Sequence, residues 1–235
     1  MAFPLYLAMT SAEFASASSP PAHMAWMACH FSSYGTGLSN LPQTLPENAM
    51  LIVNDRTSVQ GHDPELITQQ LLQAFEELKF SRVLLDLQRP DDPQTTAIAK
   101  AITQALPCPV GIAANYARGL DGPVFLPPPP LHCPLAEYIR PWQGRELWLE
   151  AALDAETITV TAAGSRIAPL QLTQIPEPTF QEDHLHCHYH INVEPQQAVF
   201  TLYRTPQTLQ VLLQEAEELG VSCAVGLYQE LGNAL

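Results

Sequence analysis

Residues 50–88 decide the fold: MLIVNDRTSVQGHDPELITQQLLQAFEELKFSRVLLDLQ. The stretch begins with a short apolar run, Met50–Asn54, and closes with a second one, Arg82–Leu87. Both runs are largely apolar rather than alternating, which indicates strands covered on both faces, as in a parallel sheet. Between them, Pro64–Leu78 has apolar residues at helical spacing, and the Asp-Pro pair that opens it is a typical helix start. The stretch therefore predicts a strand, a helix and a second parallel strand.

The same pattern recurs along the chain. Asp92-Pro93 and Thr205-Pro206 each open a further helical pattern, and an apolar run follows each helix. The sequence thus predicts an α/β fold, a (β/α)8 TIM-like barrel that is partly irregular because the helices after its first two strands look short or missing. The expected barrel strands are 3–9, 24–31, 50–54, 82–88, 109–114, 123–126, 146–152 and 222–229.

Residues 154–205 interrupt this order. Their segments look like antiparallel strands joined by plausible hairpin turns at Ala163-Gly164 and Glu194–Gln197. We therefore expect residues 1–235 to form a single barrel domain, with 154–205 as a small antiparallel β insertion between the seventh strand and its helix.

The charge balance narrows the range of partners. The chain of 235 residues has 10 Lys and Arg against 24 Asp and Glu, a formal net charge of −14. Nucleic acids and anionic membranes both need a cationic surface, so we expect neither as a partner. A small neutral molecule, such as a saccharide, fits better, and the oligomeric state stays open.

Cysteine usage and motif searches add further expectations. The five cysteines are scattered and odd in number, which favours reduced thiols and a cytoplasmic location. No run approaches the roughly 20 apolar residues that span a bilayer. The sequence also lacks a phosphate-binding loop and a G-x-G-x-x-G motif, and we expect no cofactor.

The segment Met50–Pro90 resembles the third and fourth barrel strands of the family 18 glycoside hydrolases, the chitinase-like enzymes. That family carries the pattern Asp-Gly-x-Asp-x-Asp-x-Glu, usually after Phe and often followed by an aromatic residue and Pro. Phe80, Asp86 and Pro90 match this pattern, whereas Gln88 stands where the family has its catalytic Glu. Three further motif positions depart from the family and carry Ser81, Arg82 and Leu84.

The departure at position 88 has chemical consequences. In the family, the Glu protonates the glycosidic oxygen, and the adjacent Asp positions the acetamido group of the sugar as nucleophile. Gln88 has no titratable proton and cannot be that acid. Asp86 and Gln88 lie two residues apart on a strand, so both point into the mouth of the barrel. The resemblance therefore implies a sugar-binding or altered hydrolase site, in which Asp86 positions or stabilises the substrate.

Two glutamates are candidates to replace the missing acid, Glu150 and Glu230. Glu150 alternates with Trp148 on one strand, so both side chains face the barrel interior if one does. A carboxyl near a Trp in a closed mouth has a raised pKa, which suits a general acid. Alternatively, Glu150 forms an ion pair with Arg145 or Arg204.

Other polar side chains are expected at the carboxyl ends of the strands, where barrel enzymes place their chemistry. This set of amides, carboxylates and aromatics suits a neutral polyol. The expected substrate-binding residues are His30, Asn54, Asp55, Arg56, Gln88, Arg89, Asn115, Tyr116, Trp148 and Tyr228.

The stretch His184–His190 has four histidines at alternate positions. In a strand these side chains share one face, which we expect to be solvated rather than a metal site, because no other element supplies a clear additional ligand. Contact with a ligand or sensing of pH stays an alternative.

Two functions remain open. The first is a divergent glycoside hydrolase that acts on a small neutral saccharide through Asp86 and either Glu150 or Glu230. The second is a non-catalytic carbohydrate-binding or regulatory protein that descends from a glycosidase barrel. Gln88 favours the second function, and the polar mouth allows the first.

Overall fold

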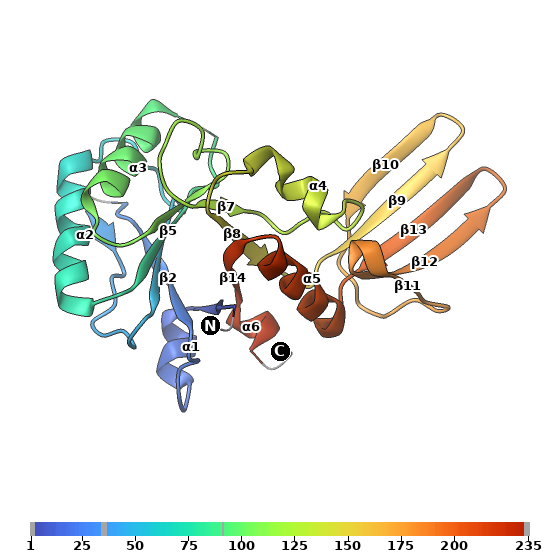
Figure 1. Cartoon of the computed structure of the whole chain (residues 1–235), viewed down its shortest axis with the longest axis horizontal. Coiled ribbons are helices and arrows are strands. Elements are labelled where there is room, and N and C mark those ends of the chain that lie inside the picture. The colour runs from blue at the N-terminus through green and yellow to red at the C-terminus, as the bar shows by residue number, and fades with distance from the viewer. Residues whose placement is uncertain (1–2, 34–36, 91, 233–235) are drawn as a thin grey trace.

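The chain forms a closed barrel of eight parallel strands, as the sequence predicts. Its helices and strands are labelled in Figure 1. The computed structural model describes residues 3–33, 37–90 and 92–232. The barrel strands follow one another around the cylinder in chain order, and the last pairs with the first. They are β1 (Leu5–Met9), β2 (Met24–Phe31), β4 (Met50–Asn54), β5 (Arg82–Asp86), β6 (Val110–Ala113), β7 (Val124–Leu126), β8 (Leu147–Ala151) and β14 (Val221–Leu227).

The helices around the barrel are uneven in length. The three long ones begin as predicted, with Asp63, Asp92 or Thr205 capping the first turn and Pro next. The first barrel strand is followed only by a six-residue helix, and the second by a two-residue strand that pairs with it antiparallel. The outer elements are α1 (Ser11–Ser16), β3 (Leu38–Ser39), α2 (Pro64–Leu78), α3 (Pro93–Ala105), α4 (Leu135–Ile139), η1 (Arg140–Trp142), α5 (Pro206–Glu218) and α6 (Tyr228–Leu231).

Strand alternation produces two separate cores. Side chains that point outward form the larger core with the helices, and those that point inward fill the cylinder. The interior core includes Tyr6, Met50, Leu84, Phe125 and Trp148, all buried. The interior of the cylinder is therefore a packed core of largely apolar side chains.

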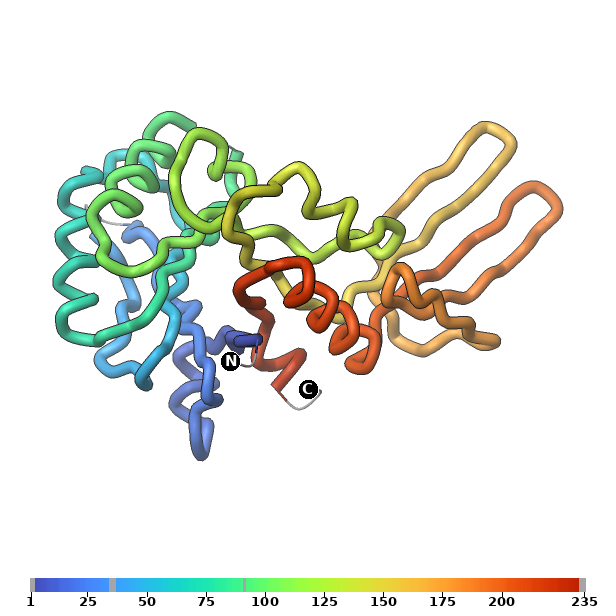
Figure 2. The backbone as a smooth tube through the Cα atoms, in the orientation of Figure 1, coloured from blue at the N-terminus to red at the C-terminus, as the bar shows by residue number. Residues whose placement is uncertain are grey.

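The predicted β insertion leaves the barrel after β8 and returns to it at α5. It is a five-stranded antiparallel sheet in the order β10-β9-β13-β12-β11. Figure 2 shows that this sheet extends away from the barrel. Its elements are β9 (Ala155–Thr161), β10 (Gly164–Pro169), β11 (Phe180–Glu182), η2 (Asp183–Leu185), β12 (Cys187–Glu194) and β13 (Gln197–Tyr203).

The predicted histidine stripe is wrong in its first half. His184 lies in η2, and His186 has a left-handed backbone with φ of 48°. Only His188 and His190 lie in β12. The 3-10 turn breaks the two-residue period of the strand, so the four rings do not share one face.

Across the described residues, no helix combines the length and the apolar character that a membrane crossing requires.

Candidate functional site

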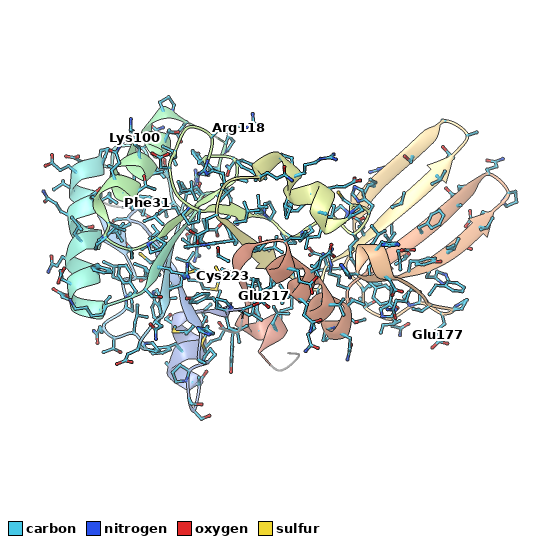
Figure 3. All side chains as sticks on the ribbon, in the orientation of Figure 1. Phe31, Lys100, Arg118, Glu177, Glu217 and Cys223 are labelled. Carbon is cyan, nitrogen blue, oxygen red and sulfur yellow. The ribbon has the colours of Figure 1, made fainter. Side chains whose placement is uncertain are left out.

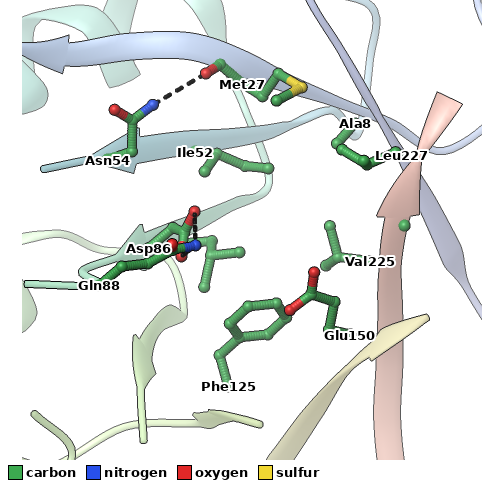
Figure 4. Close-up of a pocket in the computed structure, with 12 residues that line it drawn as sticks. Ala8, Met27, Ile52, Asn54, Asp86, Gln88, Phe125, Glu150, Val225 and Leu227 are labelled. Atoms are coloured by element: carbon green, nitrogen blue, oxygen red, sulfur yellow. Dashed lines mark hydrogen bonds between the residues drawn. The ribbon is translucent and has the colours of Figure 1, made fainter. Parts of the chain in front are cut away.

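Three cavities at the carboxyl ends of the barrel strands share the side chains of Asp86 and Gln88. The central one, of about 80 Å³, lies over the interior core and also receives Glu150 (Figure 4). Cavities of about 530 Å³ and about 390 Å³ open on either side of it. Both lateral volumes fall in the range of roughly 300–1,000 Å³ that is typical of ligand sites. The three cavities together form a cleft across the mouth, with Asp86 and Gln88 at its middle.

Asp86 and Gln88 follow each other at the end of β5, as the strand geometry predicts. The Gln88 amide nitrogen Nε2 donates to Asp86, at 3.1 Å from Oδ1 and 3.4 Å from Oδ2. Burial raises the pKa of Asp86, the Gln88 hydrogen bond partly offsets this, and the nearby Asp55 carboxylate raises it further. Gln88 thus orients Asp86 and favours its ionised form.

Glu150 lies across the cavity from Asp86, on β8. The two side chains project into the same space from opposite walls, with Phe125 beside Glu150 (Figure 4). Burial, together with the carboxylates of Asp86, Asp154 and Glu230, raises the pKa of Glu150 to about 7. Such a carboxyl is half-protonated near neutral pH, as general acid catalysis requires.

The physical reason for this pKa differs from the expected one. Trp148 faces the interior as predicted, but it is fully buried beneath the cavity, where its indole N–H donates to Glu146 at 3.0 Å. Neighbouring carboxylates and burial therefore act on Glu150, rather than an indole in the mouth. Trp148 supports the floor of the site and does not line the cleft.

The alternative of an ion pair between Glu150 and an arginine does not hold. Arg145 donates to the backbone carbonyls of Leu120 and Gly122, and Arg204 donates to that of Pro129. Within residues 3–33, 37–90 and 92–232, no cationic group lies within ion-pairing distance of Glu150.

Asp55 and Arg89 mainly hold the loop that follows β5. The Asp55 carboxylate is buried and accepts the backbone N–H groups of Gln88 at 3.0 Å and Arg89 at 2.8 Å. The Nε of Arg89 in turn donates to the backbone carbonyl oxygen of Asp55 at 2.8 Å. Asp55 also lines the 530 Å³ cavity, but both of its carboxylate oxygens are already engaged.

Four further predicted residues do line the cleft. His30, Asn54 and Arg56 contribute to the 530 Å³ cavity, and Asn115 contributes to the 390 Å³ cavity. Asn54 is fixed by donating from Nδ2 to the Met27 carbonyl oxygen at 3.1 Å. These side chains bring hydrogen-bonding groups to both lateral cavities of the cleft.

Three predicted residues lie away from the cleft. Tyr116 is buried in the outer core, where its hydroxyl donates to the Pro90 carbonyl oxygen at 2.8 Å. Tyr228 begins α6 and packs against the same core. Glu230 accepts the backbone N–H of Leu153 at 2.5 Å and so anchors the end of β8. The two tyrosines therefore do not shape the pocket, and Glu230 acts on Glu150 only through its charge.

Sequence reasoning missed several residues that line the site. Thr10, Ser11 and Asn40 extend the 530 Å³ cavity, and Phe125 forms a wall of the central one. The alternation of side chains within the apolar run 123–126 could have identified Phe125. Asn40 was not, because it lies in an irregular connection that carries no periodic signal.

His188 and His190 make local contacts within the insertion. His188 stacks on Tyr203 with 5.6 Å between the ring centroids, and the Nδ1 of His190 lies 2.8 Å from the Pro178 carbonyl oxygen. Within the part of the chain that the structure describes, no group of three or more His, Cys, Asp or Glu side chains is arranged to hold a metal ion.

Comparison with solved structures identifies the class of barrel. The chain is similar to a family 18 N-acetylglucosaminidase from Paenibacillus barengoltzii, with 9% identity over 95% of this chain and 94% of that one and a TM-score of 0.57. It is similar to the GH18 chitinase of Cycas revoluta in complex with (GlcNAc)4, with 10% identity over 95% and 94% of the two chains and a TM-score of 0.58. The spore cortex-lytic enzyme SleL of Bacillus cereus matches with 9% identity over 95% of this chain and 70% of that one, at a TM-score of 0.55.

The fold is therefore a (β/α)8 barrel like that of these three enzymes, which confirms the architecture that residues 50–90 indicated. No protein-family model matches the sequence, and no curated protein matches it either. The structural similarity shows the fold alone, and the activity has to be argued from the site.

Proposed function

We propose that the chain hydrolyses a glycosidic bond in a neutral saccharide that lies in the cleft, with Glu150 as the proton donor. The observation that carries this proposal is the pairing of Glu150 and Asp86 across one cavity, with burial raising the pKa of each carboxyl. A buried acid with a pKa of about 7 and a second carboxylate facing it are the two groups that glycoside hydrolysis uses.

The steps follow from these positions. Glu150 gives its proton to the glycosidic oxygen as the bond from that oxygen to the anomeric carbon breaks. Asp86 stabilises the positive charge that develops on the sugar, directly or by orienting a nucleophilic group of the substrate. Gln88 holds the Asp86 carboxylate in place. Water then adds to the anomeric carbon and returns a proton to Glu150, which restores the enzyme.

A second function is favoured by Gln88 itself. An amide at this position holds Asp86 by a hydrogen bond and has no proton to give. In a non-catalytic carbohydrate-binding protein, the same cleft would bind saccharide, and Glu150 would only be a buried carboxyl.

Hydrolysis and thermal stability measured with the same saccharides separate the two functions. We expect turnover of at least one aryl glycoside in a panel of sugar classes, with a rate that falls as pH rises above about 7, because Glu150 then loses its proton. Glu150→Gln should lower turnover by about 10²–10⁴-fold, whereas Glu230→Gln should have a smaller effect, since Glu230 lies outside the cleft. Glu218→Gln, an exposed change on α5, is the matched control.

Each outcome is informative. Turnover that survives Glu150→Gln excludes the proposed mechanism, whether or not Glu230→Gln also lowers it. A rise in melting temperature with a saccharide, without turnover, supports the binding protein. If sugars of every class fail both measurements, the saccharide proposal is wrong.

A further inference from the structure

We propose a second ligand site at the opposite end of the barrel, where Arg82 binds the carboxylate of a small organic monoanion. The amino-terminal end of such a barrel generally serves stability rather than ligand binding. Here it opens into a cavity of about 660 Å³, whose lining includes Tyr6, His23, Asn48, Arg82 and Ser222. This cavity shares no lining residue with the three cavities of the mouth.

Arg82 reaches this cavity from the first position of β5. Its guanidinium lies over the ring of Trp148, 5.3 Å from the centroid, and its Nε donates to the Tyr6 hydroxyl at 3.2 Å. Among the described residues, Glu146 is the only carboxylate that forms an ion pair with it, with an oxygen 3.7 Å from Nη1 and so beyond hydrogen-bonding distance. Stacking and the Tyr6 contact therefore fix the guanidinium plane, while most of its five N–H groups remain unused.

The other polar groups of the cavity add capacity for the same kind of ligand. The Nδ1 of His23 is buried and has no hydrogen-bond partner among the residues that the structure describes. The side chains of Asn48 and Ser222 likewise make no hydrogen bond with the described part of the chain, although both line the cavity. The lining of this one cavity thus combines a guanidinium with an imidazole, an amide and a hydroxyl, and the planar fork of Arg matches a carboxylate.

The remaining lining residues set the size and charge of the ligand. Phe3, Pro4, Pro109 and Val221 supply apolar walls, which suit a hydrocarbon body attached to the carboxylate. Glu217, exposed on α5 (Figure 3), is the one acidic side chain among the described residues of the lining, and it opposes any added negative charge. Glu146 and Glu217 already place negative charge at this end of the barrel, so a ligand with one carboxylate is opposed less than a phosphate dianion.

Thermal stability and tryptophan fluorescence of the whole protein test this site with benzoate and butyrate as probes. Phosphate, and chloride at equal ionic strength, serve as references. We expect benzoate to raise the melting temperature by about 2–5 °C near saturation, more than phosphate does, and chloride to have no such effect. Emission should change as well, because the guanidinium that receives the ligand lies on Trp148.

Two substitutions with opposite expected effects make the test specific. Arg82→Gln should weaken benzoate binding roughly tenfold or more, since it removes a charged hydrogen-bond donor. Glu217→Gln should tighten binding about twofold, because an exposed like charge is removed. Arg118→Gln and Glu218→Gln make the same charge changes at exposed positions outside the cavity lining and should leave affinity unchanged.

Several results would overturn the proposal. Benzoate that stabilises no more than chloride would do so, as would equal affinity in Arg82→Gln and the natural protein. If Arg82→Gln does not fold, the comparison of Glu217→Gln with Glu218→Gln decides, and equal affinities count against the site. Benzoate binding that is lost in Glu150→Gln would assign the ligand to the mouth instead.

Discussion

Replacing Glu150 by Gln should make the protein more stable at neutral and alkaline pH while removing its proposed proton donor. Burial and nearby carboxylates raise the pKa of this carboxyl from 4.5 to about 7. At about 1.36 kcal/mol for each pKa unit, ionising Glu150 in the folded state costs up to about 3 kcal/mol. Gln has nearly the same shape and never ionises, so the variant escapes that cost.

The sign of the effect depends on pH in a defined way. Between about pH 4.5 and 7, the folded protein keeps the Glu150 proton that the unfolded chain has already released, so stability falls as pH rises through this window. Below it, both states are protonated, and the variant gains nothing. Above it, the gain reaches its plateau, which we expect at about 1–3 kcal/mol, or a melting temperature higher by roughly 3–10 °C.

Denaturant unfolding at a series of pH values from 4 to 9 measures this difference directly. The free energy of unfolding of Glu150→Gln minus that of the natural protein should be near zero at pH 4 and constant above about pH 8. Glu218→Gln, at an exposed position, should show no comparable rise. A difference that is independent of pH, or a variant that is less stable at pH 8, would refute the burial argument.

Two other substitutions test the framework of the site. Gly111→Ala places a Cβ against a ring carbon of Trp148 and should cost about 2–3 kcal/mol of unfolding free energy. Most of this cost should disappear in a Trp148→Leu background. Additive costs in a double-mutant cycle would contradict the contact. Asp55→Asn loses one of the two acceptor oxygens that hold the loop after β5. It should lower the free energy of unfolding, measured with denaturant, by about 1–3 kcal/mol. Unchanged stability would show that these bonds contribute little.

Much of the fold could be predicted because its determinants are local. Each of the eight barrel strands is a short apolar run, and each long helix opens with a side-chain cap followed by Pro. The structure also contains elements that have no such signal. α4 has five residues and no side-chain cap, and β11 has three residues and largely exposed side chains, so tertiary contacts rather than periodicity define both.

The site could be predicted where a strand fixes the direction of a side chain. Asp86 and Glu150 lie on regular strands, and alternation alone places them in the mouth. Tyr116 and Asp55 lie beyond strand ends, where the turn geometry decides direction. Tyr116 packs in the outer core, and Asp55 accepts hydrogen bonds from backbone N–H groups. Polarity at a strand end therefore indicates proximity to the mouth, but it does not indicate exposure to a ligand.

The positions of Asp86 and Glu150 also bear on how a substrate would lie. In the family 18 pattern, the aspartate and the acid belong to one strand and act from the same wall of the barrel. Here they belong to β5 and β8, which are separated around the cylinder by β6 and β7. In the proposed mechanism, Gln88 keeps Asp86 oriented on one side, and Glu150 supplies the proton from the other. A saccharide that reacts in this cleft must therefore pass between two walls, with its glycosidic oxygen toward β8 and its anomeric carbon toward β5.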